Sequence, residues 1–324
     1  MMFFYALLAG FCMDLLFGDP EWLCHPVRLI GKYISFAEKK LRAGGGNLRL
    51  CAVLLTLSAV LLTMGTAGLI LLAAGRLGKA PLFLAMALLD WMGIAAKSMT
   101  QEARQVQQAL SQGIGAGRRQ VARIVGRDTQ SLSEEEVIKA TVETVAENTT
   151  DGVVSPMIYA ALGGPVLLWG FKAASTLDSM VGYMDEKYRD IGWSSARLDD
   201  VLNYLPARLT ALLMCAAAWV LRLDARGAWR IVKRDHANHS SPNCAWSEAA
   251  AAGALRIQLG GTHSYFRKDV FKPTIGDPDR PAERQDIGRA NAMLVGTALL
   301  AMGLIALLTL LLSKWIGALP FAVR

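Results

Sequence analysis

Residues 143–190 read ETVAENTTDGVVSPMIYAALGGPVLLWGFKAASTLDSMVGYMDEKYRD, and in this stretch charged side chains flank a run long enough to cross a membrane. Residues 153–171 carry no charge, whereas carboxylates and a lysine gather on both sides of them. A charged group in or beside hydrocarbon costs free energy unless it is paired or bound to a ligand. The stretch therefore predicts a membrane protein that carries out chemistry close to one of its spans.

The composition of the whole chain also indicates a membrane protein. Of 324 residues, 53% are hydrophobic and 19% are charged, and the mean hydropathy is +0.32. Soluble proteins carry about 25% charged residues. Residues 51–75 and 293–313 are uncharged runs, each long enough to span roughly 30 Å of hydrocarbon.

Four further apolar runs are less regular: residues 1–18 contain Asp14, residues 81–96 contain Asp90, residues 153–171 contain Pro156 and Gly163-Gly164-Pro165, and residues 209–221 are short and follow Arg208. We find no strand-like alternation. We therefore expect an all-α, multi-pass integral membrane protein with about four to six membrane segments and a possible re-entrant or broken helix. Residues 1–324 are interpreted as a single membrane-embedded enzyme domain.

The basic residues are unevenly distributed along the chain, which has a net charge of +7. With about six crossings, loops 19–50, 97–152 and 222–290 share one side of the membrane and hold most of the lysines and arginines. The positive-inside rule makes that side cytoplasmic. The excess is interpreted as topology and attraction to the lipid bilayer, and no nucleic acid partner is expected, because no basic motif is interleaved with aromatic residues.

Two of these loops allow local predictions. Ser133 and Glu136 have the spacing of a capping box, which predicts a helix start within surface helices over residues 100–150. In the largest polar loop, residues 260–281 are expected to be irregular.

Glu143, Glu147 and Asp151 recur every four residues, which places them on one face of a helix. Like charges at this spacing repel, and a divalent cation such as Mg²⁺, which prefers oxygen ligands, would reverse the penalty. Asn148 adds an amide to this face. The alternative is a solvated acidic face that Lys139 partly neutralises.

A second stripe is formed by Ser175, Asp178, Gly182 and Asp185, with Lys172 close to the same face. Asp178 and Asp185 are further candidate magnesium ligands. The alternative is helix packing through small residues, which is common in membranes.

The segment SARLDDVLNYLPARLT, residues 195–210, contains Arg197, Asn203 and Arg208. An arginine pair is a preferred partner of phosphate or carboxylate groups, although a surface ion-pair network explains the pattern too. His25 precedes a proline in a loop, where a lone histidine is more often structural than catalytic. The chain has none of the standard phosphate-binding loops, GxxxxGK[ST] or GxGxxG.

Several long motifs occur in a fixed order: GDPEWLCHPVRLIG, AENTTDGVVSP, FKAASTLDSMVGY, SARLDDVLNYLPARLT, SPN…SEAAAAGAL and LGG…Y…KPTIG. Together they closely resemble the CobD/CbiB family of cobalamin biosynthesis proteins, from about residue 10 to residue 290. The family pattern SPNAGWPEAAMAGALG stands here as SPNCAWSEAAAAGALR, and LGGxNxYFG stands as LGGTHSYFRK.

The resemblance implies an acid–amine ligase in a bacterial cytoplasmic membrane, with its active site facing the cytoplasm. It would join adenosylcobyric acid, a corrinoid, to (R)-1-amino-2-propanol or its O-phosphate, driven by ATP and Mg²⁺. Other membrane-associated cobamide-assembly enzymes are expected partners. A carboxylate does not condense with an amine unaided, so it must first become an acyl phosphate or a similar group.

From this chemistry we assign candidate roles. Glu143, Glu147, Asp178, Lys172 and His25 are candidate catalytic residues, and one carboxylate or His25 must deprotonate the incoming ammonium. Arg197, Arg208, Asn148 and Asn203 are candidate substrate or phosphate ligands, joined in this role by Lys172. Glu143, Glu147, Asp151, Asp178 and Asp185 are the candidate Mg²⁺ ligands.

Two other classes of protein remain open. A transporter could use intramembrane carboxylates and broken helices, but the chain lacks an inverted repeat and has large polar loops on one side. A signalling membrane protein of the AmpE kind shares the general plan, but it has no use for dense acidic motifs. If one active site exists, residues 143–151 and 175–185 must converge, which requires residues 153–171 to return to their starting side or to stop part-way.

Overall fold

The computed structural model describes residues 1–20, 25–183, 185–265 and 268–317. The chain divides into two compact units. Unit 1 contains residues 1–95, 155–202 and the chain from residue 301 onward, and unit 2 contains residues 96–154 and 203–300. The expectation of a single domain over residues 1–324 stays a prediction.

Four helical segments are long and apolar enough to span a membrane, and they are Leu48–Leu77, Lys79–Gln112, Glu134–Val181 and Arg284–Ser313. A fifth is possible if Trp193–Leu202 and Tyr204–Val220 together form one span, and Met2–Phe17 is a shorter apolar helix. The prediction of an all-α, multi-pass membrane protein is confirmed.

Unit 1 is a helical assembly in which α1 packs on α4, and α8 packs on α1, α2, α3 and α4. Ala6, Met86 and Ala87 form one apolar cluster between α1 and α4. Its helices are α1 (Met2–Phe17), α2 (Pro26–Ala43), α3 (Leu48–Leu77), α4 (Lys79–Gly93), α8 (Ser155–Val181), α9 (Trp193–Leu202) and the C-terminal part of α13 (Arg284–Gly317).

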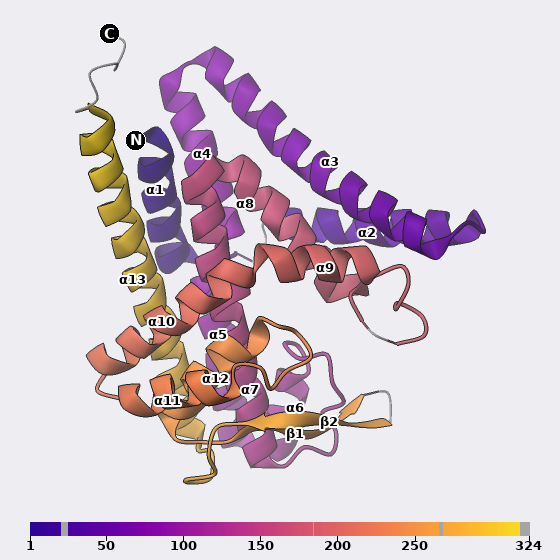
Figure 1. The fold of residues 1–324 in the computed structure, drawn as a ribbon, viewed down its shortest axis with the longest axis vertical. Helices are drawn as coiled ribbons and strands as arrows, with labels where there is room; N and C mark the ends of the chain where they lie inside the picture. Colours follow the sequence, from indigo (N-terminus) through magenta and orange to yellow (C-terminus); the bar gives the residue numbers. More distant parts are fainter. Residues whose placement is uncertain (21–24, 184, 266–267, 318–324) are drawn as a thin grey trace. The chain divides into compact units, whose positions relative to one another are not determined.

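Helix α8 is broken at Gly163-Gly164, as the sequence predicts, and Figure 1 shows its two halves meeting at a bend. Gly163 and Gly164 have non-helical backbone angles, and Pro165 follows them. Gly164 has a φ of 65°, and a Cβ there would lie 2.9 Å from the Phe3 ring. Only glycine adopts this conformation at low cost, so the break is built into the sequence.

Unit 2 combines helices with the one β-hairpin of the described residues. Its elements are α5 (Ala96–Gln112), α6 (Ile114–Val121), α7 (Glu134–Asn148), the π-helical segment η1 (Thr149–Val154), α10 (Tyr204–Val220), α11 (Ala225–Asp235), α12 (Cys244–Leu255), β1 (Leu259–Tyr265), β2 (Lys268–Ile275) and the N-terminal part of α13.

Helix α12 is the centre of unit 2, because it packs on α7, α10, α11 and β2. Alanines occupy much of it, and every residue from Ser247 to Leu255 is buried. Its closest neighbour is α11, where a Cβ on Gly253 would lie 2.5 Å from the carbonyl oxygen of Gly227. The two helices therefore meet backbone to backbone, as Figure 1 illustrates.

The expectation that residues 260–281 are irregular was wrong for most of this segment. Strands β1 and β2 pair antiparallel, with an irregularity in register between Leu259 and Gly261. Gly260 and Gly261 both have positive φ, which fits a β-bulge. The hairpin lacks regular alternation of polar and apolar residues, which explains why the sequence pattern did not reveal it.

Helix α7 begins as predicted. The Ser133 hydroxyl accepts a hydrogen bond from the Glu136 N–H, and the Glu136 carboxylate accepts one from the Ser133 N–H. At its other end α7 leads directly into η1, which contains Asp151. Single π-helical turns inside helices occur frequently at functional sites.

Candidate active site

Glu143 is held by two donors from other parts of unit 2. Arg127 Nη2 lies 2.9 Å from one carboxylate oxygen, and the Gly260 N–H donates to the other at 2.9 Å. The Arg127 and Glu143 side chains are only 5% and 13% exposed. This part of the acidic stripe is therefore not a solvated face, because Glu143 forms a buried ion pair with the loop before α7 and a hydrogen bond that joins α7 to the hairpin.

Glu147, one turn further along α7, connects the stripe to α12. The Cys244 thiol donates to a Glu147 carboxylate oxygen at 3.5 Å, and Cys244 is the first residue of α12. Glu143 and Glu147, at positions i and i+4 of α7, both act on the pKa of Glu248 in α12, as expected for residues on one helix face. Asn148 lies beside them, and its amide donates to the Thr144 carbonyl at 2.9 Å.

Glu248, one turn into α12, is buried with 7% exposure. Burial raises the pKa of this carboxyl well above its usual range, and the nearby Glu143 and Glu147 raise it further. Lys272 and Arg127 act in the opposite direction without reversing the shift. Glu248 is therefore a carboxyl that keeps its proton to unusually high pH, which is a property of many acid–base groups.

The electrostatics of Cys244 show that these carboxylates gather at one place. Burial raises the pKa of the Cys244 thiol well above its usual value, and Glu147, Asp151 and Glu248 each add to the shift. A thiol in this environment stays protonated and is a poor nucleophile. The π-helical segment that carries Asp151 thus brings it to the same cluster as the α7 carboxylates.

His239 adds a neutral imidazole to the cluster. Burial and the nearby Lys272 lower the pKa of His239 to about 4. The Ser241 N–H donates to His239 Nδ1 at 3.0 Å, so in this arrangement Nε2 carries the ring proton. Glu143 lies close enough to oppose the shift.

Arg208, on α10, lies next to the start of α12. Its guanidinium is 3.4 Å from the Asn243 side-chain oxygen and stacks on the rings of Tyr204 and Trp246, at 3.5 and 4.8 Å from their centroids. Asn243 directly precedes Cys244, so Arg208 borders the carboxylate cluster. Asn203, another predicted ligand, is buried just before α10.

The cluster does not offer an assembled magnesium site. Among the described residues, no three histidine, cysteine or acidic side chains have an arrangement that could hold a metal ion. Both oxygens of Glu143 already accept hydrogen bonds, from Arg127 and Gly260. The assignment of Mg²⁺ to Glu143, Glu147, Asp151, Asp178 and Asp185 stays a prediction.

The second predicted stripe lies in unit 1. Lys172 and Asp178 are half-buried on the C-terminal half of α8, and the Gly182 N–H donates to the Asp178 carbonyl at 2.7 Å. Asp185 is exposed and accepts a hydrogen bond from the Tyr188 N–H at 2.9 Å, which closes a turn. The convergence of this stripe with Glu143–Asp151 stays a prediction.

His25 and Arg197 also belong to unit 1. His25 caps α2, because its Nδ1 accepts a hydrogen bond from the Val27 N–H at 3.3 Å, and its Nε2 lies 3.6 Å from Asp19. This geometry accounts for His25 as a structural cap. Arg197 lies on α9. The catalytic role of His25 and the phosphate-binding role of Arg197 stay predictions.

Five residues of the cluster were not predicted as site residues: Arg127, His239, Cys244, Glu248 and Lys272. They come from loops, α12 and β2, and all except Arg127 lie more than eighty residues after the acidic stripe in sequence. The sequence contained one signal that could have identified Glu248 as a site residue. Glu248 is the only charged residue between Asn243 and Leu255, in a helix otherwise rich in alanine. A lone carboxylate in such a helix indicates a buried site.

Comparison with known proteins shows the family of this chain. The family model described as CobD/Cbib protein matches residues 7–294. The cobalamin biosynthesis protein CobD of Geobacter metallireducens is 48% identical over 309 residues, covering 95% of this chain and 97% of that protein. CobD of Listeria monocytogenes serotype 4b is 43% identical, covering 96% and 99%, and CbiB of Salmonella arizonae is 44% identical, covering 92% and 95%. No solved structure matches. The chain therefore belongs to the CobD/CbiB family of cobalamin biosynthesis proteins.

Proposed function

We propose that the protein joins adenosylcobyric acid to (R)-1-amino-2-propanol or its O-phosphate, forming an amide bond. The observation that carries the proposal is the cluster of Glu143, Glu147, Asp151 and Glu248 in unit 2, set among basic side chains in a membrane protein of this family. The reaction needs groups of both signs, because its substrates bring a carboxylate and an ammonium.

The cluster can supply the proton acceptor that amide formation requires. The incoming amine attacks a carbonyl carbon only after it loses a proton, and a carboxylate with a raised pKa is a stronger base than an ordinary one. Glu248 has this property, and Glu143 and Glu147 beside it maintain the negative potential that attracts a cationic amine.

Basic residues at the edge of the cluster can hold the anionic parts of the substrates. Arg208 presents a guanidinium that is already positioned by two aromatic rings, so little side-chain entropy is lost when it binds phosphate or carboxylate. Lys272 lies within electrostatic reach of Glu248. ATP, when bound, would supply the activation of the corrin carboxylate.

The proposal also includes orientation. The cluster belongs to the loops rich in lysine and arginine, 97–152 and 222–290, which the positive-inside rule places in the cytoplasm. An active site on that side of a bacterial cytoplasmic membrane has access to cytosolic ATP and to soluble substrates.

A growth experiment tests the function. A strain that lacks this gene and depends on cobalamin is expected to grow on cobinamide but not on cobyric acid. Growth on both, or on neither, would contradict the assignment and leave a transporter or a signalling protein as the explanation. Purified protein in nanodiscs, supplied with adenosylcobyric acid, aminopropanol phosphate, ATP and Mg²⁺, gives the direct measurement of the amide product.

A further inference from the structure

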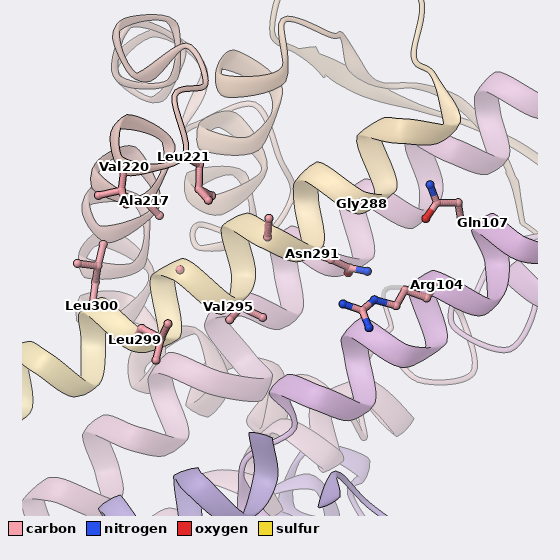
Figure 2. A pocket seen from close by; sticks show the side chains of 12 residues that line it. Arg104, Gln107, Ala217, Val220, Leu221, Gly288, Asn291, Val295, Leu299 and Leu300 are labelled. Carbon is pink, nitrogen blue, oxygen red and sulfur yellow. The ribbon is translucent and has the colours of Figure 1, made fainter. Parts of the chain in front are cut away.

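A groove in unit 2 is lined mostly by apolar side chains and has an arginine at one end. Its volume is about 530 Å³, within the usual range for small-molecule sites. Helices α5, α10 and α13 line it. Figure 2 shows Arg104 and Gln107 of α5 directed toward Asn291 of α13 at one end, with Val220, Leu299 and Leu300 at the other. None of the cluster residues described above lines the groove.

The polar end holds an uncompensated positive charge. Arg104 is exposed, and among the described residues no hydrogen bond or ion pair involves it. The neighbouring carboxylates already have other partners, because Glu102 pairs with Arg123 at 3.1 Å and Asp286 with Arg280 at 2.6 Å. An anion at this end would therefore meet attraction without a competing internal partner.

Asn291 contributes a second polar group at the same end. Its side chain is only 3% exposed, and its amide donates to the Thr100 carbonyl at 3.1 Å. Its carboxamide oxygen accepts no hydrogen bond within the described residues. A ligand with a donor, such as a hydroxyl, would satisfy this oxygen after a small side-chain rotation.

The position of the groove along α13 matches one leaflet of a bilayer. The polar end lies at Gly288, in the charged first turns of a helix that is uncharged from Ala290 to Ser313. From Gly288 to Leu300 the helix rises by roughly 18 Å, and half of a hydrocarbon core is about 15 Å. Val220 and Leu299, at the apolar end, are 61% and 53% exposed, as expected for side chains that face lipid.

We propose that this groove binds one anionic glycerophospholipid, with its phosphate at Arg104 and one acyl chain along Val295, Leu299 and Val220. The phosphate matches the charge, a hydroxyl of the headgroup matches Asn291, and the chain matches the apolar length. The site is separate from the cluster assigned to amide formation and does not depend on that assignment.

Native mass spectrometry of the full-length protein in mild detergent tests the proposal. Phosphatidylglycerol and phosphatidylcholine with identical acyl chains are titrated separately. We expect phosphatidylglycerol to bind about tenfold more tightly to the unmodified protein, and Arg104→Gln to remove this difference. Arg119→Gln, which removes the same charge from an exposed position on α6 outside the groove, is the matched control and should bind like the unmodified protein.

A second variant tests the apolar part. Ala292 lines the groove and is exposed, so Ala292→Phe fills space without disturbing the core. It should weaken binding of both lipids. Equal binding of the two lipids by the unmodified protein, or full phosphatidylglycerol binding by Arg104→Gln or Ala292→Phe, would overturn the proposal. Displacement of the lipid by aminopropanol phosphate, but not by inorganic phosphate, would also overturn it by identifying a substrate site.

Discussion

Glu248 and its neighbours show how strongly position alters the chemistry of a side chain. Glu147 and Glu248 are the same residue type, in the last turn of α7 and one turn into α12, and both raise the pKa of Cys244. Glu248 is buried with 7% exposure, and Glu143 and Glu147 lie close enough to raise its pKa further. Burial among other carboxylates therefore makes it the group best suited to exchange a proton.

The first prediction concerns Glu248→Gln. Glutamine resembles the protonated carboxyl, so the variant should fold, but it cannot accept a proton, and amide formation should fall by about 10²–10⁴-fold. Because the pKa of Glu248 is raised, the basic form appears only as pH rises, and the rate of the unmodified protein should increase with pH through that pKa. The rate of product formation against pH measures this.

The same shift predicts the pH dependence of stability. A carboxyl whose pKa is raised by folding contributes stability at low pH and loses it as pH rises through the folded-state pKa, and Glu248→Gln should lack this loss. Glu186→Gln, an exposed carboxyl far along the chain, is the control and should change neither profile. A normal rate in Glu248→Gln would show that another group accepts the proton.

The second prediction concerns Glu147→Gln. The amide oxygen can still accept the Cys244 thiol hydrogen, so folding and membrane insertion should be preserved, while loss of the charge should lower turnover by about 10²–10³-fold. Glu134→Gln is the matched control, because Glu134 lies on the same helix but pairs at the surface with Arg284 at 2.6 Å. Near-normal turnover of Glu147→Gln at limiting Mg²⁺ would contradict both a catalytic and a metal-binding role.

At the scale of elements, helix α8 depends on one backbone conformation. Gly164→Ala would place a Cβ at a φ of 65° and 2.9 Å from the Phe3 ring. The expected cost is about 1–3 kcal/mol, measured as a lower Tm of the protein in detergent. Gly65→Ala on α3 is the control, because nothing lies within 4 Å of its added Cβ. It should leave the Tm unchanged or raise it slightly. An unchanged Tm for Gly164→Ala would mean that α8 adapts without its break.

The elements also show which parts of the structure the sequence can reveal. The capping box at Ser133 and the break at Gly163-Gly164 were predictable because each depends on residues next to each other in the chain. The hairpin and η1 were not, because long-range contacts stabilise them. The Gly260 N–H, for example, is bonded to Glu143, more than a hundred residues earlier. The local sequence pattern does not reveal a contact between residues so far apart in the chain.

The candidate site also contains residues that the sequence predicts and residues that it does not. The acidic stripe of Glu143, Glu147 and Asp151 followed from helical spacing, and Glu147 and Asp151 do lie near Cys244, while Glu143 acts with Glu147 on Glu248. Arg127, Lys272 and Glu248 complete the cluster from three other segments. Each of these three residues is unremarkable in its own sequence context, except for the isolation of Glu248 among alanines. The folded chain alone brings them together.

At the scale of the whole molecule, the sequence predicts which side of the membrane residues 143–151 and 175–185 face. They belong to different units. We predict that both segments face the cytoplasm. The break in α8 permits this, because a broken helix can line a polar cavity without completing a crossing.

Cysteine labelling tests this prediction. Single cysteines at Ser131 and Ser175, in a background without the native cysteines, should react with a membrane-impermeant maleimide from the same face of sealed vesicles. Ser131 is exposed and provides the reference for the cytoplasmic side. Reaction of the two positions from opposite faces would place them about 30 Å apart across the hydrocarbon and exclude a single site.

The close approach of Gly227 and Gly253 limits which residues of this protein can be substituted without moving the candidate site. A methyl group on either glycine would lie less than 3 Å from the other helix, so α11 and α12 would have to separate. Separation of the two helices would move Glu248, which lies on the same helix as Gly253. Substitutions at Gly227 or Gly253 are therefore expected to displace Glu248, whereas substitutions at Asn243 and Arg208, where side chains rather than backbones meet, are expected to leave the packing of α11 on α12 intact.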